Sequence, residues 1–296
     1  MMVSDMGVSV SIVLCTYNVE DYVSNCLKAI LGQTFSDFEL LIIDDSTDNT
    51  GNIIRMFNDP RIKYFKGEER LGLAKSRNKG IKLSTGNYVF FTDADCVVSR
   101  DWLAQGMRSF ASGCVGVEGR TVYVSEDYKP TFSDSVIKNQ QGGQFMTCNI
   151  AYKKSVLERV GGFDERYDYY EDRDLAFRVK RFGKIVFNPS MVVYHQKMKI
   201  TPRNFIRRAN RIRNRVLLFK RFRDVWSGRI PNPLGRIINP LDFLVVFCPV
   251  LILSYLAIYR FKSREDWNLF PYIWIKKVYE RISLWHACAL HKVFLI

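Results

Sequence analysis

The segment that most constrains the fold of this chain runs from Asn87 to Asp95. Its first six residues, Asn-Tyr-Val-Phe-Phe-Thr, predict a buried strand that runs directly into Asp93-Ala94-Asp95. Two carboxylates spaced i, i+2 at a strand end suit a hard cation such as Mg²⁺ or Mn²⁺, which binds carboxylate oxygens together with substrate phosphates. Taken alone, such a triplet is also typical of a solvated turn. The rest of the chain decides between a metal site and a turn.

The positive charge of the chain is concentrated in its last third. Residues 1–200 carry 26 Lys/Arg against 25 Asp/Glu, a net charge of +1, whereas residues 201–296 carry 18 against 5, a net charge of +13. With 47% hydrophobic residues, the chain can bury one substantial core. We therefore expect a folded domain over residues 1–200 and a basic tail over residues 201–296. Such a tail suits nucleic acid or an anionic membrane surface.

The seven cysteines are scattered, and no two of them form a C-x-x-C pair. This usage is typical of reduced, mostly buried thiols in a protein that faces the cytosol. The N-terminus lacks a basic region followed by a long apolar stretch, so we expect no cleaved signal peptide.

Short apolar runs alternate with helical patterns over the first 120 residues. This alternation predicts βα units and hence an α/β fold with a mainly parallel central sheet. The expected strands are Val8–Cys15, Phe38–Ile43, Arg61–Phe65 and Asn87–Thr92. In open α/β sheets, ligands bind beyond the carboxyl ends of the strands. Three polar groups fall there and should line one crevice: Thr16-Tyr17-Asn18, Asp44-Asp45 and Asp93-Ala94-Asp95.

The pattern loosens after Cys114. Helices are expected over Leu71–Leu83 and Asp172–Phe182, whereas residues 125–144 are polar and fit no regular element. A region of that length is usually functional or disordered. Further short strands are predicted at Glu118–Val124, Phe145–Tyr152, Val186-Phe187 and Met191–Tyr194.

Six short motifs follow one another in a specific order and spacing: Ser11–Asn18, Ile42–Asp48, Ala74–Gly80, Asp93–Asp95, Gly162–Glu165 and Glu171–Leu175. Together they resemble the family 2 glycosyltransferases over residues 8–200. The resemblance implies a nucleotide-binding βα sandwich of the glycosyltransferase-A type, with residues 1–200 as its catalytic domain. It also implies a UDP- or GDP-sugar donor, Mn²⁺ or Mg²⁺, and inversion at the anomeric carbon.

Two features depart from the family pattern. The loop Asp45–Thr50 lacks the glycines that are usual after the second strand. The tail lacks the Gln-x-x-Arg-Trp signature of processive polysaccharide synthases. We therefore expect an enzyme that adds a single sugar.

The resemblance assigns the donor to side chains near the strand ends. The nucleoside would be held by Thr16, Tyr17, Asp44 and Asp45. The Asp45 carboxylate would accept a hydrogen bond from a base N–H, although a helix-capping turn is the alternative for the two aspartates. Arg77 would contact a phosphate or else lie in solvent, and Asn149 would touch the donor sugar or tie a loop.

The metal is expected at Asp95, with Asp93 as a further ligand or as a contact to the ribose or to a water in the second coordination shell. A bound cation would neutralise the charge that develops on the departing nucleoside diphosphate. His195 ends a short apolar strand, so it is either a ligand to the metal or diphosphate or a structural histidine.

Inverting transfer needs a base on the sugar face opposite the leaving group. Asp172, at the start of a predicted helix, is the expected catalytic base, and a helix N-cap is the alternative. Glu171 and Asp174 would bind the acceptor or support the loop. Trp102 is expected in the core.

The tail has two notable parts. Residues Arg203–Asp224 contain nine Lys/Arg and one Asp, with apolar residues at helical spacing, which predicts a basic amphipathic helix for a membrane surface or for docking on the catalytic domain. Phe243–Tyr259 is a stretch of 17 uncharged residues with Pro249 in its middle. It would either cross the membrane or lie in the interface. We expect the catalytic domain to face the cytoplasm.

These observations predict a membrane-associated, metal-dependent inverting glycosyltransferase that acts on a glycan or a lipid-linked acceptor. A polyprenyl-phosphate glycosyl synthase is the alternative within the same class. From another class, the chain could be a noncatalytic membrane-bound module that binds a nucleotide sugar or nucleic acid. The acidic positions argue against nucleic acid as a partner, because they repel phosphates.

Overall fold

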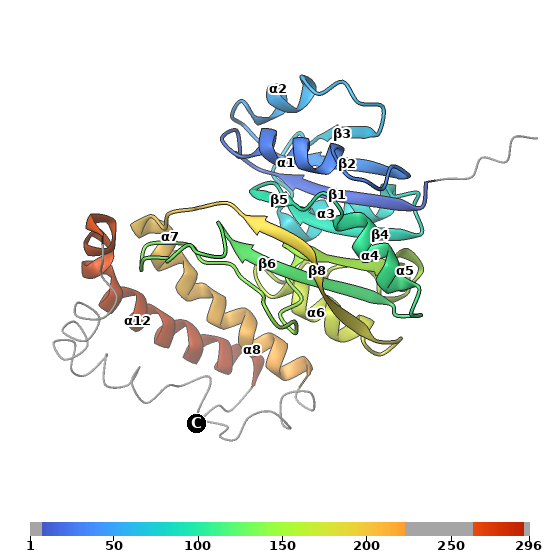
Figure 1. The fold of residues 1–296 in the computed structure, drawn as a ribbon. Helices are drawn as coiled ribbons and strands as arrows, with labels where there is room; N and C mark the ends of the chain where they lie inside the picture. Colours follow the sequence, from blue (N-terminus) through green and yellow to red (C-terminus); the bar gives the residue numbers. More distant parts are fainter. Residues whose placement is uncertain (1–7, 223–262, 293–296) are drawn as a thin grey trace, which may run out of the picture. The chain divides into compact units, whose positions relative to one another are not determined.

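The computed structural model describes residues 8–222 and 263–292. These residues form two compact units (Figure 1). Among the described residues, the first unit contains residues 8–128 together with Ile137–Gln196, and the second contains Lys129–Val136 together with residues 197–222 and 263–292. Each unit has hydrophobic clusters of its own.

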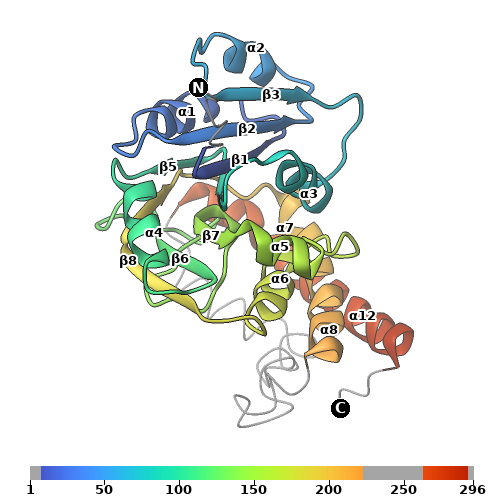
Figure 2. The same ribbon diagram turned by 90° about the vertical axis from the view of Figure 1, so that its right-hand side faces the viewer.

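The first unit is built on an eight-stranded sheet with the strand order β3-β2-β1-β4-β7-β6-β8-β5. The strands are β1 (Val10–Thr16), β2 (Phe38–Asp44), β3 (Ile62–Lys66), β4 (Tyr88–Asp93), β5 (Cys96–Val98), β6 (Gly116–Tyr123), β7 (Ile150–Lys153) and β8 (Ile185–His195). The first four lie parallel to one another, and Figure 2 shows β3, β2 and β1 in succession. Their carboxyl ends therefore meet at one edge of the sheet.

The sheet as a whole is mixed, whereas the sequence predicted a mainly parallel one. β7 is antiparallel to both β4 and β6, and β5 is antiparallel to β8. β7 follows β6 through a loop and a 3-10 helix, η1 (Thr147–Asn149), and without a crossover helix, so it returns antiparallel. The two short strands predicted near residue 190 form the single strand β8, which pairs in parallel with β6.

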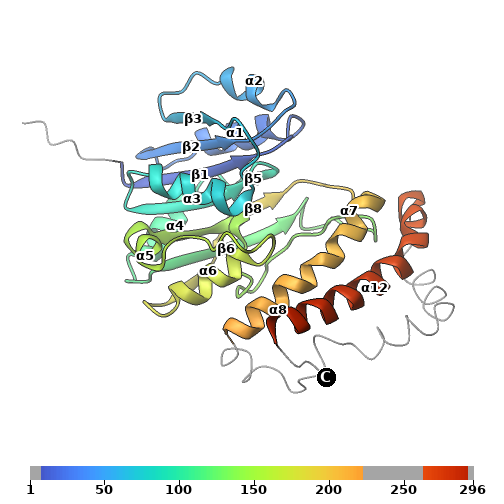
Figure 3. The same cartoon turned by 180° about the vertical axis from the view of Figure 1, so that it is seen from behind.

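Helices cover both faces of the sheet. α1 (Val23–Leu31), α2 (Thr50–Arg55) and α4 (Trp102–Phe110) pack on one face, and α3 (Leu73–Leu83), α5 (Lys154–Val160) and α6 (Glu171–Val179) pack on the other, which Figure 3 shows from behind. β1 supplies Ile12 and Leu14 to the first core and Val13 to the second, because successive side chains of a strand alternate. Trp102 is fully buried in the first core, as predicted.

α3 lies directly against β1. A β-carbon at Gly80 would stand 2.4 Å from Cγ1 of Val13, so only glycine permits this approach. The close packing brings Ser76 and Arg77, one turn earlier on α3, to the ends of β2 and β4, where they hydrogen-bond to Asp45 and Asp93.

The second unit is helical. Its described residues form α7 (Pro202–Arg207), the 3-10 helix η2 (Arg208–Asn210), α8 (Arg211–Arg221) and α12 (Arg264–His291), and they include Lys129–Val136. The sequence predicted one basic helix over Arg203–Asp224, whereas a 3-10 turn divides this stretch into two helices. Phe205 packs against Leu269 and Ile273, and Val216 packs against Leu284, so α7 and α8 run beside α12 in the same direction (Figure 3).

α12 begins with a capping box in which Ser263 and Asp266 hydrogen-bond to each other's backbone N–H. The fully buried Asp266 also accepts a hydrogen bond from the backbone N–H of Ser133, at 2.6 Å. Within the described ranges, 8–222 and 263–292, no helix combines the length and apolarity of a membrane span. The predicted apolar stretch Phe243–Tyr259 lies outside these ranges.

Glu39 is a buried acid on β2 that joins the ends of three segments. Its Oε1 accepts hydrogen bonds from the hydroxyls of Ser11 and Thr85 and from the backbone N–H of Thr85, at 2.6 to 2.8 Å. Its Oε2 pairs with Nζ of Lys63 at 2.6 Å. Burial alone would raise the pKa of Glu39, but the bonds from Lys63, Ser11 and Thr85 outweigh burial and lower the pKa to about 2.

We expect Glu39→Gln to reduce the free energy of unfolding at neutral pH by about 1–2 kcal/mol, because it removes an ion pair and places an amide NH₂ among donors. The folded pKa is depressed, so the stabilisation by Glu39 is present above about pH 4.5 and is lost as the pH falls toward about 2. Denaturant titrations at several pH values should show the difference between variant and wild type shrinking in this window. Glu68→Gln removes an exposed acid and should change little; an equal loss at every pH would contradict the role of ionised Glu39.

Candidate active site

Asp44 and Thr16 end neighbouring parallel strands and bond to each other. The Asp44 carboxylate is fully buried and accepts hydrogen bonds from the Thr16 hydroxyl at 2.8 Å and from the Tyr64 hydroxyl at 2.6 Å. The backbone N–H of Ser46 and Nζ of Lys66 complete its partners, at 2.9 and 3.2 Å. The sequence assigned Asp44 and Thr16 to the nucleoside, whereas the structure uses both to join the ends of β1, β2 and β3.

Asp45 points to the other side of the strand end and keeps one oxygen without a partner. Its Oδ2 accepts hydrogen bonds from the backbone N–H of Leu71 at 2.9 Å and from the Ser76 hydroxyl at 3.2 Å. Its buried Oδ1 has no hydrogen-bond partner among the described residues. A buried carboxylate oxygen without a donor is costly. This oxygen is therefore suited to a ligand N–H.

Tyr17 offers an exposed ring beside Asp45. The backbone N–H of Asp45 donates to the carbonyl of Thr16, the last residue of β1, at 3.0 Å. Tyr17, the next residue in the chain, therefore begins close to Asp45. The Tyr17 side chain is 41% exposed, and the guanidinium of Arg70 lies 3.9 Å from the centre of its ring. An exposed aromatic ring suits stacking against a planar base, and the unpaired oxygen of Asp45 suits an N–H donor of such a base.

Arg77 joins the acidic motif after β4 to the N-terminus of α6. Its Nη2 donates to Oδ1 of Asp93 at 3.1 Å and its Nη1 to Oε1 of Glu171 at 2.7 Å. Arg77 is only 4% exposed, which excludes the alternative that its side chain lies in solvent. Burial alone would lower the pKa of Arg77, but the charges of Asp93 and Glu171 outweigh it and keep the pKa above its usual value. A permanent positive charge thus lies between the two acidic motifs.

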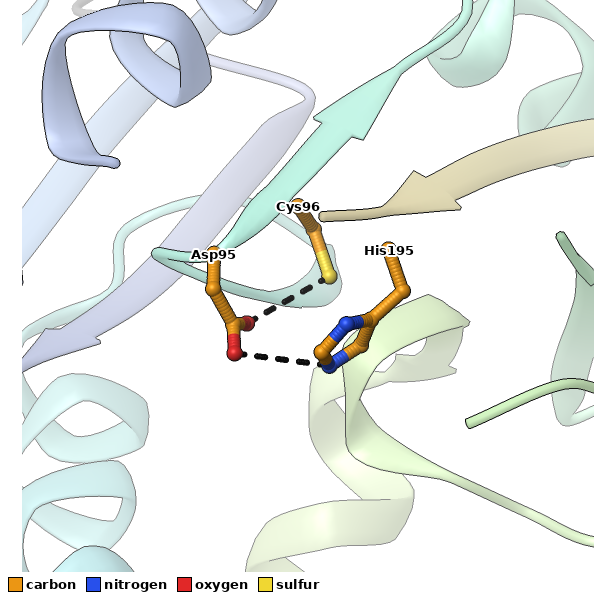
Figure 4. Close-up of side chains that lie close together, drawn as sticks. All are labelled: Asp95, Cys96 and His195. Atoms are coloured by element: carbon orange, nitrogen blue, oxygen red, sulfur yellow. Dashed lines mark hydrogen bonds and ion pairs between the residues drawn. The ribbon is translucent and has the colours of Figure 1, made fainter. Parts of the chain in front are cut away.

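Asp95, Cys96 and His195 form a cluster at the start of β5 and the end of β8 (Figure 4). One ligand atom of each lies within 4.8 Å of the others. Nε2 of His195 is 3.4 Å from Oδ2 of Asp95, and Sγ of Cys96 is 3.7 Å from Oδ1. The pairing of Cys96 with His195 across β5 and β8 brings the histidine, 100 residues distant in sequence, to the acidic motif.

The environment of this cluster fits a divalent cation. Nδ1 of His195 is 3.0 Å from the carbonyl of Gln196, which can only accept, so Nδ1 carries a proton and Nε2 faces the carboxylate. Burial raises the pKa of Asp95. The interaction with His195 lowers this pKa, and the negative charge of Asp93 raises it further. A cation would offset the burial of Asp95. Burial raises the pKa of Cys96 well above its usual value, so Cys96 is suited to donate its S–H to Asp95.

Asp172 lies in the first turn of α6 and has the properties of a proton acceptor at neutral pH. Burial and the neighbouring charge of Glu171 raise the pKa of Asp172 to about 7, although the backbone N–H of Arg173 and the charge of Arg77 oppose the rise. The Arg173 N–H donates to Oδ1 of Asp172 at 2.7 Å. A base is most effective when its pKa lies near the working pH.

Asp174 and Asn149 each bond to other parts of the protein. The fully buried Asp174 accepts from Nε of Arg178 at 2.8 Å, and Arg178 donates on to the carbonyl of Val160 at 2.7 Å. Asn149 accepts from the Trp102 indole N–H at 2.8 Å, and its amide donates to the carbonyls of residues 120 and 191. Of the roles considered for these two residues, the structure supports only the tying of loops.

The acids expected at one crevice do converge, and α3 is where they meet. Ser76 bonds to Asp45, and the next residue, Arg77, bonds to Asp93 and Glu171. Sequence reasoning missed Cys96 and Tyr64. Cys96 could have been found, because it directly follows Asp95, whereas Tyr64 gave no signal beyond its place in a strand.

Comparison with known proteins agrees with a nucleotide-binding α/β enzyme of the glycosyltransferase-A type. The family model described as Glycosyl transferase family 2 matches residues 11–163, and the chain belongs to this family. Similar curated proteins include two from Escherichia coli that are named UDP-Glc:alpha-D-GlcNAc-diphosphoundecaprenol beta-1,3-glucosyltransferase. WfgD is 26% identical over 80% of this chain and 92% of its own length, and WfaP is 30% identical over 59% and 70%.

Two solved structures share the fold. The mannosyltransferase PcManGT from Pyrobaculum calidifontis, in complex with GDP-Man and Mn²⁺, has a TM-score of 0.58 and 20% identity, over 95% of this chain and 87% of its own. S. aureus TarS 1-349, in complex with UDP-GlcNAc, has a TM-score of 0.56 and 16% identity, over 96% of this chain and 90% of its own. At these identities the likeness concerns the fold alone.

We expect the rate of sugar transfer to fall as the pH drops through about 7, because Asp172 must be ionised to accept a proton. Arg77 lowers the pKa of Asp172, so Arg77→Gln should move this acidic limb to higher pH and reduce transfer at pH 7 severalfold. The measurement is kcat against pH for folded wild type and variant. Arg166→Gln removes an exposed ion pair with Asp164 and should leave the limb in place. An unmoved limb in Arg77→Gln would exclude this coupling.

Proposed function

We propose that this chain is an inverting, metal-dependent glycosyltransferase that moves a sugar from a UDP- or GDP-sugar to a lipid-linked glycan. One observation carries the proposal: the buried guanidinium of Arg77 binds Asp93 of the acidic motif and Glu171 beside Asp172. A group suited to the donor's metal and a group suited to be the base therefore belong to one site. A noncatalytic binding module has no need of this coupling.

The donor side follows from Asp45, Tyr17 and the Asp95 cluster. The unpaired Oδ1 of Asp45 would accept the imide N–H of uracil or guanine, and the Tyr17 ring would lie against the base. WfgD and WfaP use UDP-Glc by name, and PcManGT was solved with GDP-Man and Mn²⁺, so relatives use both kinds of base. Asp95 and His195 would hold Mn²⁺ or Mg²⁺, and the charge of Asp93 acts on Asp95. When bound, the cation neutralises charge on the leaving diphosphate.

Asp172 would act as the general base. The acceptor hydroxyl oxygen bonds to the anomeric carbon as the bond from that carbon to the diphosphate oxygen breaks, and the hydroxyl proton passes to the Asp172 carboxylate. The nucleoside diphosphate leaves from the opposite face, so the configuration inverts. Arg77 keeps Glu171 and Asp93 in place throughout, because it is buried and bonded to both.

The acceptor is proposed from the relatives. WfgD and WfaP are named for an α-D-GlcNAc-diphosphoundecaprenol acceptor, which is a sugar carried on a lipid diphosphate. The product distinguishes this reaction from that of a polyprenyl-phosphate glycosyl synthase. A lengthened oligosaccharide is expected for the first, and a sugar monophospholipid that is labile to mild acid for the second.

The second unit supports work at a membrane surface, with the first unit on the cytoplasmic side. Residues 197–222 carry ten Lys/Arg and no Asp or Glu. α12 exposes three tryptophans, Trp267, Trp274 and Trp285, together with Ile275 and Ile282. All five lie on the helix face opposite the buried Leu269, Ile273 and Leu284. Exposed tryptophans beside basic residues are typical of a helix that lies in the interface of an anionic membrane.

The donor reaction can be tested with a panel of nucleotide sugars and Mn²⁺ or Mg²⁺. We expect one donor to raise the melting temperature only when metal is present, and Asp95→Asn to abolish this shift. Asp172→Asn should keep the metal-dependent shift and lose transfer by about a hundredfold or more. Asp101→Asn, a change at a surface helix start, serves as the control. Full transfer by Asp172→Asn would remove Asp172 from the mechanism.

Membrane binding can be tested by sedimentation with phosphatidylcholine vesicles, with and without phosphatidylglycerol. We expect the full chain to bind only the anionic vesicles, and less so at high salt. Replacing Trp267, Trp274 and Trp285 by Ser should reduce the bound fraction strongly, because these rings would enter the interface. Met56→Ser combined with Phe182→Ser removes exposed apolar groups from the first unit and should not change binding. Equal binding by the tryptophan variant would exclude this surface.

A further inference from the structure

The two residues expected to bind the acceptor are already occupied by protein partners. Asp174 is fully buried against Arg178, and Glu171 is 7% exposed and bonded to Arg77. The acceptor must therefore be recognised by other side chains near Asp172. A set of other side chains lies near Asp172. These side chains come from the loop before η1 and from the N-terminus of α6.

We propose that these side chains form the subsite for the terminal pyranose of the acceptor, and that the buried Glu118 holds the subsite in shape. The subsite consists of Gln144, Tyr169, Tyr170 and Arg173. The inference rests on the proposed function, since it names where the acceptor of that reaction binds.

The four side chains contact one another in the order Tyr169, Tyr170, Arg173 and Gln144, and the backbone of Arg173 bonds to Asp172. The rings of Tyr169 and Tyr170 meet edge to face with their centres 4.7 Å apart, and the guanidinium of Arg173 lies 5.5 Å from the centre of the Tyr170 ring. Nη2 of Arg173 donates to Oε1 of Gln144. The backbone N–H of Arg173 donates to Oδ1 of Asp172, at 2.7 Å. A sugar on these side chains would lie next to the proposed base.

The backbone at Tyr170 is held in a conformation that non-glycine residues rarely adopt. Its φ is +73°, in the left-handed region, directly before Glu171 and Asp172. Such a residue costs free energy and persists only where its surroundings fix it, which is most often at functional sites. Here the Tyr170 carbonyl accepts from the N–H of Asp174 at 3.0 Å, and its ring is covered by Arg173. The strain orients Tyr169 and Tyr170 at the start of α6.

Glu118 fixes the loop that carries Gln144. Glu118 lies on β6, is 2% exposed and has no Lys or Arg partner among the described residues. Its carboxylate accepts instead from the backbone N–H groups of Gly143, Gln144 and Phe145, at 2.6, 2.9 and 2.5 Å, and from the Asn139 amide at 2.8 Å.

The loop can surround this carboxylate only because three of its residues have positive φ. The values are +78° for Gly142, +81° for Gly143 and +56° for Phe145. Successive N–H groups then converge on the charge, which is how a concave backbone binds an anion. Because a buried carboxylate without these donors would be costly, the loop and Glu118 stabilise each other. The side chain of Gln144 thus projects from a rigid turn.

The chemistry of these four side chains suits a sugar ring. A pyranose has one apolar face that can lie on an aromatic ring, and hydroxyls that both donate and accept hydrogen bonds. Tyr169 is 37% exposed, and Gln144 is exposed. The amide of Gln144 donates and accepts, and Arg173 donates, so together they can bind neighbouring hydroxyls.

The test compares acceptor KM with donor KM, using a GlcNAc-diphospholipid acceptor and the donor found in the panel. We expect Tyr169→Ala and Gln144→Ala each to raise acceptor KM by about tenfold relative to any change in donor KM, because each removes one contact to the acceptor. Tyr169→Phe keeps the ring and should restore a near wild-type acceptor KM. Gln141→Ala, a change of the same residue type in the same loop, is the matched control and should leave both constants unchanged.

Glu118→Gln tests the positioning role. It should raise acceptor KM as Gln144→Ala does, with a smaller effect on donor KM, whereas a purely structural role would lower stability without this split. If Glu118→Gln does not fold, Gln144→Ala and Tyr169→Ala alone test whether the acceptor binds at this subsite. Unchanged acceptor KM in both of those variants, with normal sugar transfer, would overturn the subsite and leave the proposed function standing. A wild type that transfers no sugar from any nucleotide sugar of the panel would overturn the proposed function and the subsite together.

Discussion

The candidate site depends on one buried positive charge. Arg77 lies between Asp93 and Glu171, which are far apart in the sequence, and it neutralises carboxylates that would otherwise repel one another. A buried pair is costly to break from one side, because the remaining charge has no compensation. The position of Arg77 depends in turn on Gly80, which lets α3 lie against β1. The missing side chain at Gly80, which leaves room for the Val13 side chain, thus helps to set the geometry of the acids.

Much of the fold could be predicted from the sequence, because parallel strands leave strong periodic signals. The four parallel strands and the helix α3 appear within two residues of the predicted bounds. The antiparallel part was harder, since β7 has only four residues and follows a loop whose bends depend on Glu118, more than 20 residues earlier. Hydrogen bonds to backbone N–H groups leave no pattern in the side chains. Nothing in residues 125–144 alone could reveal that loop.

The site was predicted in part, and strand alternation explains why Asp44 and Asp45 bond to different elements. Asp44 and Asp45 are adjacent, so their side chains point to opposite sides of the sheet. Asp44 continues the row of Leu40 and Ile42 and meets Tyr64, whereas Asp45 points toward α3 and meets Ser76. The alternation of side chains along a strand would have predicted different partners for the two aspartates. No such reasoning was possible for Asn149 or Asp174, because their partners Trp102 and Arg178 are known only once the packing is known.

The second unit includes a piece from the middle of the chain. Lys129–Val136 leaves the first unit after Tyr128, bonds through Ser133 to Asp266 of α12, and returns at Ile137. A truncation near residue 200 would remove the helical tail but leave the eight residues Lys129–Val136 without the unit that they pack in. The backbone N–H of Ser133 would then lose its acceptor, Asp266. Shortened forms of this enzyme therefore need both a new C-terminus and a replacement for the segment Lys129–Val136.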